Sequence, residues 1–511
     1  MERTAPEQVE PLATCAITGE DASVPVPGGV PVEARANPGR RVGAQDVAVN
    51  SDYASLGMPL PTDIARLKGA GKFSAAATAC RELMASGEAP ELAARLRIEA
   101  HRLSRLAQQY SASPEQALEE LARECPGFTR EDLERLMARG RIDWRMVEGE
   151  VRFVGSYMDA LRVYAHEIPG LKAPHKDTSA RDAAIAQMRE RGVASWRMTL
   201  RASLAVPGAH AGERVRAWLP VAAACPQQSE IEVLAATPGA HVAADNVAAR
   251  TASWSLVAGE GPAEFSVTYR YRIDAPYVDL WSEEGVERAF RQGVLVGGSP
   301  APAPTPADLS ELAPHIVFSP LVCAAAQRVR GAAKDGSALE LARAAYDYVT
   351  NNVDYRFQPA YAQLDCISET CLASRRGDCG VMALTFITLC RALGVPARWQ
   401  SGLYTTPSSV GPHDWAMFYV EGIGWLWADC SFGSSARREG AEQRRRHYFG
   451  NLDPWRTVCN SAFFAEFEPP TDGVRWDPYD NQTGEASVEG RGCDSFEMPR
   501  TIELLEAEQL G

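Results

Sequence analysis

The sequence predicts a multidomain α+β protein, and three observations indicate this fold class. Apolar residues recur at helical spacing within residues 55–192, for example at Leu92 and Leu96. Residues 193–276 instead alternate like strands, with Gly, Pro, Asn and Asp turns between them. Residues 337–470 combine a buried-helix pattern with a hairpin pattern. A chain of 511 residues, 45% of them hydrophobic, is long enough for about three domains.

Residues 1–54 are rich in Pro, Gly, Val and Ala without periodicity, which predicts a flexible N-terminal arm. The first fifty residues lack a basic start followed by an apolar core, and no apolar stretch is long enough to span a bilayer. We therefore expect a cytoplasmic protein. The twelve cysteines are spread along the chain, and several, such as Cys80 and Cys390, lie on predicted buried helix faces, so we expect reduced thiols.

Residues 55–192 are predicted to form a helical domain. Helices near Pro114–Glu124 and Arg130–Arg139, followed by a hairpin over Ile142–Phe153, loosely resemble a winged helix. No helix here is clearly basic, and the formal net charge of the chain is −14, so DNA binding is disfavoured. A helical scaffold is favoured, and whether it restricts access to a functional groove stays open.

Residues 193–276 are predicted to form a β-sandwich domain. Strands are expected at Arg197–Val206, Glu213–Leu219 and Glu264–Ile273. A scaffold role is favoured over a substrate-positioning surface, because function belongs to specific sites and not to a fold.

Residues 277–336 are predicted to form a helical connector, interrupted by an exposed Pro-rich loop at Ser299–Pro306. An α+β core is expected to follow over residues 337–470. It opens with Ser337 and Glu340, which have the spacing of a capping box at the start of a helix.

The run Gly377-Asp378-Cys379-Gly380 places a thiol at the start of a predicted helix, with Asp378 as N-cap. The helix is predicted to be buried on one face, and Gly394 and Pro396 are predicted to end it. The buried face consists of Met382, Phe386, Leu389, Cys390 and Leu393. A thiol in the first turn feels the positive end of the helix dipole, so we expect the pKa of Cys379 to be lowered.

Trp415–Val420 and Trp425–Asp429 are predicted to form a hairpin around a turn at residues 421–424. His413 and Asp429 have their midpoint at residue 421, so we expect their side chains to face each other. The aspartate would orient the imidazole, whose other nitrogen would exchange a proton with Cys379. The order Cys379, His413, Asp429 is typical of a thiol acyl-transfer triad.

These motifs resemble the core of the transglutaminase-like superfamily, over about Ser337 to Phe464. The matching features are the cysteine at a helix start, the helix exit, the histidine strand and the strand before the aspartate, at Cys379, Gly394–Arg398, His413–Trp415 and Gly424–Asp429. The resemblance implies a papain-like α+β core with Cys379 as nucleophile, His413 as general base and acid, and Asp429 orienting the histidine. Cys430 departs from the pattern, because bacterial relatives often have proline there.

The resemblance also implies acyl transfer through a thioester to water or to an amine, without a cofactor. Hydrolysis of a peptide or protein amide is favoured, because an amine-selective enzyme needs a shielded acceptor channel. The alternative is a non-catalytic peptide-binding module that retains the fold. Val215–Pro220, with Gln227 and Gln228, resembles the immunoglobulin-like module that often precedes this core. The substrate, the acceptor and the oligomeric state are not indicated.

Several further residues have open roles. The backbone N–H of Cys379 is a natural oxyanion donor, and Gln358, Tyr361 and Gln363 are equal candidates for a second donor. Sheet packing is favoured over a substrate platform for the tryptophans of this region, Trp399, Trp415, Trp425 and Trp427.

No metal site is expected. The gaps between Cys366, Cys371 and Cys379 do not match paired zinc ligands, and the turns at residues 451–455 and 477–481 lack EF-hand spacing for calcium. A basic cluster follows the triad and is expected to be a solvated face more than a carboxylate-binding site: Arg437, Arg438, Arg444, Arg445, Arg446 and His447. Residues 471–511 are predicted to form a C-terminal extension, a tail with a short helix at Ile502–Gln509.

Overall fold

The structure is a computed structural model that describes residues 51–174, 177–294, 297–298 and 301–511. Most of the predicted N-terminal arm lies outside the described residues. Its last four residues form helix α1, Ser51–Ala54. Within the described ranges, no helix has the length and the apolar composition needed to cross a bilayer.

The region after α1 is mainly helical, as its apolar spacing predicted. Its helices are α2 Thr62–Gly69, α3 Phe73–Ser86, α4 Ala93–Gln109, α5 Pro114–Glu124, α6 Arg130–Ala138, α7 Tyr157–Val163 and α8 Ser179–Arg191. Strands β1 Trp144–Val147 and β2 Glu150–Phe153 form the predicted hairpin. Helix α4 contributes Leu96, Ala100, Leu103 and Leu106 to the apolar core of this region and packs against α3.

Two antiparallel sheets follow and pack around one apolar core. Their strand orders are β17-β16-β4-β7-β6 and β18-β3-β8-β5. The strands are β3 Val193–Val206, β4 Arg214–Pro220, β5 Gln228–Ala236, β6 His241–Val242, β7 Thr251–Val257, β8 Ala263–Pro276, β16 Glu485–Val488, β17 Arg491–Gly492 and β18 Arg500–Leu510. The strands β16, β17 and β18 come from the C-terminal end of the chain.

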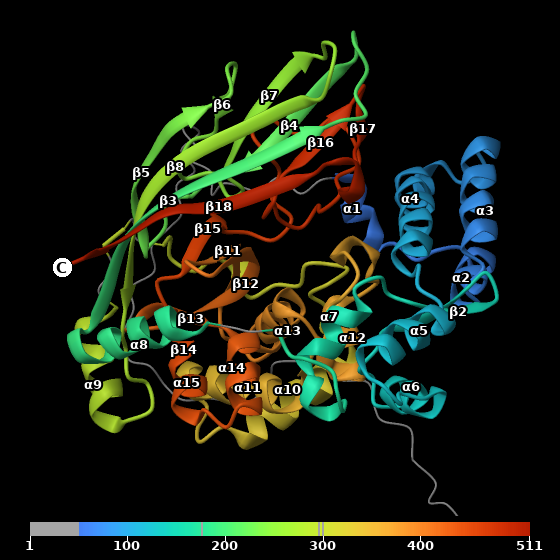
Figure 1. The fold of residues 1–511 in the computed structure, drawn as a ribbon. Helices are drawn as coiled ribbons and strands as arrows, with labels where there is room; N and C mark the ends of the chain where they lie inside the picture. Colours follow the sequence, from blue (N-terminus) through green and yellow to red (C-terminus); the bar gives the residue numbers. More distant parts are fainter. Residues whose placement is uncertain (1–50, 175–176, 295–296, 299–300) are drawn as a thin grey trace, which may run out of the picture. The chain divides into compact units, whose positions relative to one another are not determined.

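The helix predicted at Ile502–Gln509 is wrong, because β18 occupies this segment and pairs with β3 (Figure 1). Ile502 and Leu504 are half-buried, whereas Thr501 and Glu503 are exposed. This alternation has the period of a strand with one face on a core. The predicted tail is therefore part of a sheet.

The connector carries helices α9 Glu283–Gln292 and α10 Pro320–Ala332. Of the predicted Pro-rich loop, residues 299 and 300 lie outside the described residues, and residues 301–305 have no regular structure. Ser337 begins helix α11, Ala338–Asn352, and its hydroxyl accepts a hydrogen bond from the N–H of Glu340. The Glu340 side chain instead accepts from Arg343, so no complete capping box forms.

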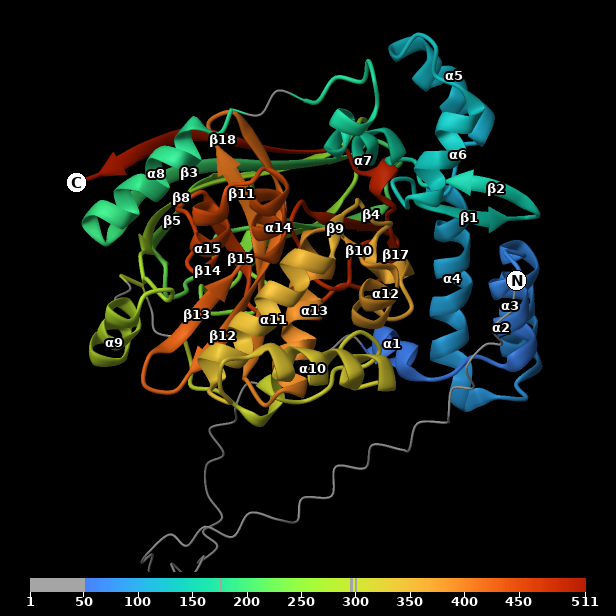
Figure 2. The same cartoon turned by 90° about the horizontal axis from the view of Figure 1, so that it is seen from below.

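The core combines helices with a five-stranded antiparallel sheet of order β14-β13-β12-β11-β15. Its helices are α12 Ile367–Ser374, α13 Cys379–Ala392, α14 Cys430–Arg438 and α15 Glu442–His447. Its strands are β11 Ala397–Thr406, β12 Ser409–Val420, β13 Gly424–Ala428, β14 Phe449–Gly450 and β15 Arg456–Asn460, with a separate parallel pair, β9 Asp354–Tyr355 and β10 Arg376–Gly377. Helix α13 contacts strands β11 and β12 and also helices α10 and α11, which lie beside it in Figure 2.

Candidate active site

Cys379 is the first residue of α13, and Asp378 is its N-cap, as predicted. The Asp378 carboxylate accepts a hydrogen bond from the N–H of Val381 at 3.2 Å, which satisfies one of the unpaired donors at the helix start. The Cys379 side chain is half-buried. The helix ends at Ala392 before Gly394, whose φ of 84° suits glycine at this exit.

Gly380 leaves space beside the thiol that two polar side chains occupy. A Cβ atom at this position would lie 2.4 Å from the Tyr361 hydroxyl and 2.6 Å from Oδ2 of Asp414. The Tyr361 hydroxyl accepts from the Gly380 N–H at 3.0 Å and lies 2.7 Å from Oδ1 of Asp378. A glycine is therefore required for these groups to approach Cys379.

The thiol of Cys379 hydrogen-bonds to a carboxylate. Its Sγ atom donates to Oδ2 of Asp414 at 3.3 Å. Among the described residues, Cys379 makes no hydrogen bond to His413, the neighbour of Asp414 in β12. The sequence patterns predicted no separate role for Asp414.

His413 and Asp429 meet, although not by the predicted register. Val420 pairs with Gly424, so the hairpin is centred on residue 422 and not 421. His413 and Asp429 are therefore not directly opposite in the ladder. Their side chains still meet, with Nε2 of His413 2.7 Å from Oδ2 of Asp429.

Asp429 is anchored from several sides. It is the N-cap of α14, and its Oδ1 accepts from the N–H of Phe432 and the hydroxyl of Ser431, each at 2.9 Å. Oδ2 accepts from Nη2 of Arg456, also at 2.9 Å. Burial alone would raise the pKa of Asp429, but the charges of His413 and Arg456 and these hydrogen bonds lower it to about 2. The carboxylate is thus ionised at neutral pH.

The sequence patterns predicted no role for Arg456. It is fully buried in β15 and also lies 3.3 Å from Oδ1 of Asp453. All five residues of β15 are buried, and a buried charge needs a partner, but the sequence Arg-Thr-Val-Cys-Asn does not reveal this burial. Arg456 holds Asp429 in place against His413.

His413 and Asp414 leave β12 on opposite faces, as neighbouring strand residues do. On the face of Asp414, Ala416 and Phe418 belong to the apolar cluster that contains α13. On the face of His413, Trp415 lies in a separate cluster. The site therefore has two parts, the pair Cys379–Asp414 and the chain His413–Asp429–Arg456.

The predicted lowering of the Cys379 pKa is wrong for this structure. Burial raises the pKa of the thiol well above 9.0, and the charges of Asp414 and Asp378 raise it further. These effects outweigh the helix dipole, which contributes only modestly within the first turn. Burial likewise raises the pKa of Asp378 to about 6 and, together with the charge of Asp378, that of Asp414 to about 7.

More carboxyl groups lie behind Asp414. Its Oδ1 accepts from Nε2 of Gln482 at 2.5 Å, and Gln482 also donates to the carbonyl of His413. Burial first, and then neighbouring acidic charges, raise the pKa values of Asp477 and Asp480 well above 3.8. The C-terminal segment thus adds further acidic groups around Asp414.

The three oxyanion candidates occupy different places. Tyr361 lies beside Cys379 through its contacts with Gly380 and Asp378. Gln358 donates its side-chain amide to the carbonyl of Arg356. Gln363 is buried, and its amide atoms have no hydrogen-bond partner among the described residues.

The tryptophans of the core are buried in packing clusters, in agreement with the favoured interpretation. Trp415, Trp425 and Trp427 lie in one cluster, and Trp399 lies in the main core. The predicted solvated basic face is wrong for Arg445 and His447, which are buried. Arg445 pairs with Asp347 and Glu442, so it ties α15 to α11.

In the two turns that were considered for calcium binding, aspartate side chains accept hydrogen bonds from other protein groups. Asp453 accepts from the Tyr448 hydroxyl at 2.8 Å and from the N–H of Trp455. Asp477 accepts from the N–H of Tyr479.

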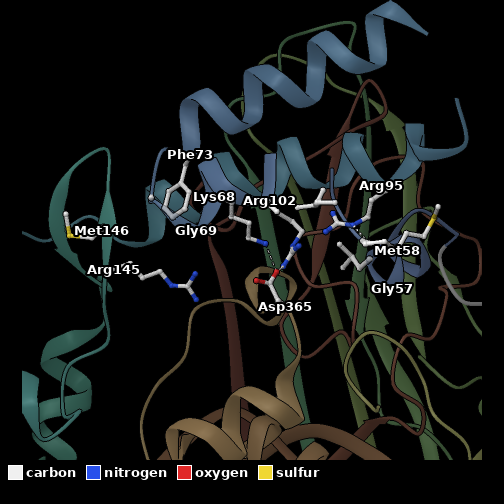
Figure 3. A pocket seen from close by; sticks show the side chains of 15 residues that line it. Gly57, Met58, Lys68, Gly69, Phe73, Arg95, Arg102, Arg145, Met146 and Asp365 are labelled. Carbon is white, nitrogen blue, oxygen red and sulfur yellow. Dashed lines mark hydrogen bonds and ion pairs between the residues drawn. The ribbon is translucent and has the colours of Figure 1, made fainter. Parts of the chain in front are cut away.

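A cavity of about 690 Å³ opens between the N-terminal helices and the segment before α12 (Figure 3). Lys68, Arg95 and Arg102 line it and pair with the buried Glu99, and Lys68 and Arg102 also pair with Asp365. Cys379, His413, Asp414 and Asp429 do not line this cavity. The ion pairs instead hold the segment that carries Tyr361 against α4, because Arg102 also donates to the carbonyls of Ala362 and Leu364.

The family model for the transglutaminase-like superfamily matches residues 324–430. The match includes Cys379, His413 and Asp429. The chain therefore contains a transglutaminase-like superfamily domain. No curated protein sequence is detectably similar to the chain.

Solved structures with similar folds are distant. A candidate cysteine protease from Cytophaga hutchinsonii is 15% identical, with a TM-score of 0.38, over 62% of this chain and 91% of that chain. The periplasmic domain of TgpA from Pseudomonas aeruginosa is 16% identical, with a TM-score of 0.25, over 52% of this chain and 96% of that chain. A candidate protease from Parabacteroides distasonis is 10% identical, with a TM-score of 0.19, over 54% of this chain and 46% of that chain.

Proposed function

Because residues 324–430 form a transglutaminase-like domain, we propose that the protein is a thiol enzyme that hydrolyses a peptide or protein amide through a thioester on Cys379. The observation that carries the proposal is the arrangement of His413 on Asp429 and Arg456, next in the chain to the residue that contacts the Cys379 thiol. We also propose that the two antiparallel sheets that contain β3 and β4 form an immunoglobulin-like unit, and that this unit serves as a scaffold.

In the first half-reaction, the Cys379 sulfur attacks the amide carbonyl carbon while the thiol proton passes to His413. Because His413 lies on the opposite face of β12 from the thiol, this transfer requires the segment around His413 to change its conformation. The carbonyl oxygen becomes an oxyanion, with the Cys379 N–H as proposed donor. The C–N bond then breaks, and His413 returns its proton to the leaving amine. Asp429 holds the imidazole and stabilises its protonated form.

In the second half-reaction, His413 takes a proton from water, and the hydroxide oxygen attacks the thioester carbonyl. The C–S bond breaks, the acid leaves and the proton returns to the thiol. Transfer to an amine follows the same steps with nitrogen in place of water. Water is favoured, because no shielded acceptor channel was indicated by the sequence.

Intact-mass spectrometry with an activated peptide ester tests this mechanism. We expect one acyl adduct on the wild type and none on Cys379→Ala, with amide turnover reduced by roughly a thousandfold or more in the variant. Cys366→Ala is the matched control, because Cys366 is another half-buried thiol in the core region and should keep the adduct. Equal labelling of wild type and Cys379→Ala would contradict the proposal.

A second function has one specific observation in its favour. The resting thiol is protonated and hydrogen-bonded to Asp414, as expected of a peptide-binding module without turnover. In that case a peptide would bind with equal affinity to the wild type and to Cys379→Ala, and neither protein would form an adduct.

A further inference from the structure

We propose that Asp414 is a positioning residue that holds the Cys379 thiol in a protonated resting state, hydrogen-bonded to the Asp414 carboxylate. This inference rests on the proposed function. It makes the enzyme latent until a substrate or another change opens the contact between sulfur and carboxylate.

The first support is that both oxygens of Asp414 are fixed. Oδ2 lies 3.3 Å from Sγ of Cys379 and 3.2 Å from the Tyr361 hydroxyl, and Oδ1 accepts from Gln482. The side chain is 2% exposed, so water does not screen its charge. The carboxylate is therefore aimed at the sulfur by neighbours that restrain it.

The second support is the space kept for this contact. Any side chain at residue 380 would collide with Tyr361 and Asp414. Asp414 also lies on the face of β12 that packs toward α13, where the neighbouring inward residues are the apolar Ala416 and Phe418. A buried carboxylate among such residues costs stability unless it has partners, and the thiol is one of them.

The third support is the charge of the surroundings. Asp378 faces Asp414 from the start of α13, Asp477 and Asp480 face it from the C-terminal segment, and Tyr355 faces the thiol from β9. Arg475 faces Asp480. The groups nearest to the sulfur are thus acidic or neutral, and they favour the protonated thiol.

This arrangement gives a defined consequence for Asp414→Asn. An amide at this position carries no charge and can donate to a thiolate, so Cys379 should react faster. We expect labelling by 2,2′-dithiodipyridine to be roughly tenfold faster at pH 8.5, which corresponds to about one unit in the thiol pKa. The two proteins should react at similar rates at pH 5.5, where Asp414 of the wild type is protonated.

The experiment compares the full-length wild type with Asp414→Asn and Gln482→Ala, and peptide mapping assigns the label. Gln482→Ala is the matched control, because it removes a partner of Asp414 but leaves the charge; it should not accelerate labelling of Cys379. Cys366 in the same molecules reports whether the fold is intact. Labelling of Cys379 in a folded Asp414→Asn that is no faster at pH 8.5 would overturn the inference.

If Asp414→Asn does not fold, the S–H stretching band of the wild type supplies the test, assigned by its loss in Cys379→Ala. We expect the band to move to lower frequency between about pH 6 and 8, as the acceptor becomes charged. A band that stays constant with pH overturns the inference. Faster labelling without any acyl adduct would refute the proposed function but not the role of Asp414.

Discussion

Arg456 is a fully buried cation between two carboxylates, Asp429 and Asp453. Replacing it with methionine keeps much of its volume but leaves both acidic groups without their cation. We expect Arg456→Met to lower the free energy of unfolding by about 3–5 kcal/mol, measured by urea denaturation. Arg437→Met, which removes a partly exposed pair with Asp354, should cost less than about 1 kcal/mol. Equal losses of free energy in the two variants would contradict a larger contribution from the buried ion pairs of Arg456 than from the exposed pair of Arg437.

At the scale of single residues, the sequence predicted the N-cap role of Asp378 and the contact between His413 and Asp429. It did not predict the contacts that Asp414 and Arg456 make. A strand pattern with an acidic residue on its inward face, as at Asp414, signals a buried carboxylate, but only the fold shows which group it contacts. The charge on the Cys379 thiol was misjudged for the same reason, since burial depends on tertiary packing.

At the scale of elements, β18 illustrates how a short segment can satisfy two patterns. Its charged and apolar residues are compatible with an exposed helix, and pairing with β3 decides the outcome. Similarly, the hairpin of β12 and β13 was predicted with its centre misplaced by one residue, because the turn type was not fixed by the sequence.

The strand pairing predicts effects of different size for substitutions at adjacent residues of β18. Ile502 packs against the core of the two sheets, whereas Glu503 is exposed. We expect Ile502→Glu to lower the free energy of unfolding by about 1–3 kcal/mol and Glu503→Gln to change it by less than about 0.5 kcal/mol. Chemical denaturation of both variants checks this. Similar effects at the two positions would argue against a strand with one buried face.

At the scale of the whole described region, stability should depend on pH through its buried carboxyl groups. The folded-state pKa values of Asp378 and Asp414, about 6 and about 7, lie above their ordinary value of 3.8. At these two groups the folded state therefore binds protons that the unfolded state has released, so their contribution to stability decreases as pH rises from about 4 to about 7. Buried histidines oppose this trend, because burial lowers the pKa of His101 to about 4 and the pKa values of His315 and His447 to about 3, below their ordinary value of 6.5. Asp429 and Glu99, with pKa values of about 2, oppose it only below about pH 5.

Urea denaturation at pH 5 and pH 8 measures this dependence. We expect the stability of Asp414→Asn relative to the wild type to increase from pH 5 to pH 8, because only the wild type loses the proton of Asp414 as pH rises. A stability difference between the two proteins that does not change with pH would contradict a protonated Asp414 in the folded state at pH 5.

The large divisions of the chain were accessible from the sequence, because helical and strand periodicities persist over many residues. The contribution of residues 485–510 to the sheets that begin at residue 193 was not, because pairing between distant segments leaves no local pattern. The contact of α4 with the segment before α12 is a similar case. It depends on Arg102, whose charged side chain is buried against backbone carbonyls of that segment.

The pairing of β18 with β3 also orders events during protein synthesis. The ribosome releases β3 early, and the whole transglutaminase-like domain must be translated before β18 exists. Throughout that interval one edge of β3 has no native neighbour and can pair with strands of other nascent chains. A chaperone that shields this edge would therefore increase the yield of correctly folded protein more than one that acts on the finished chain.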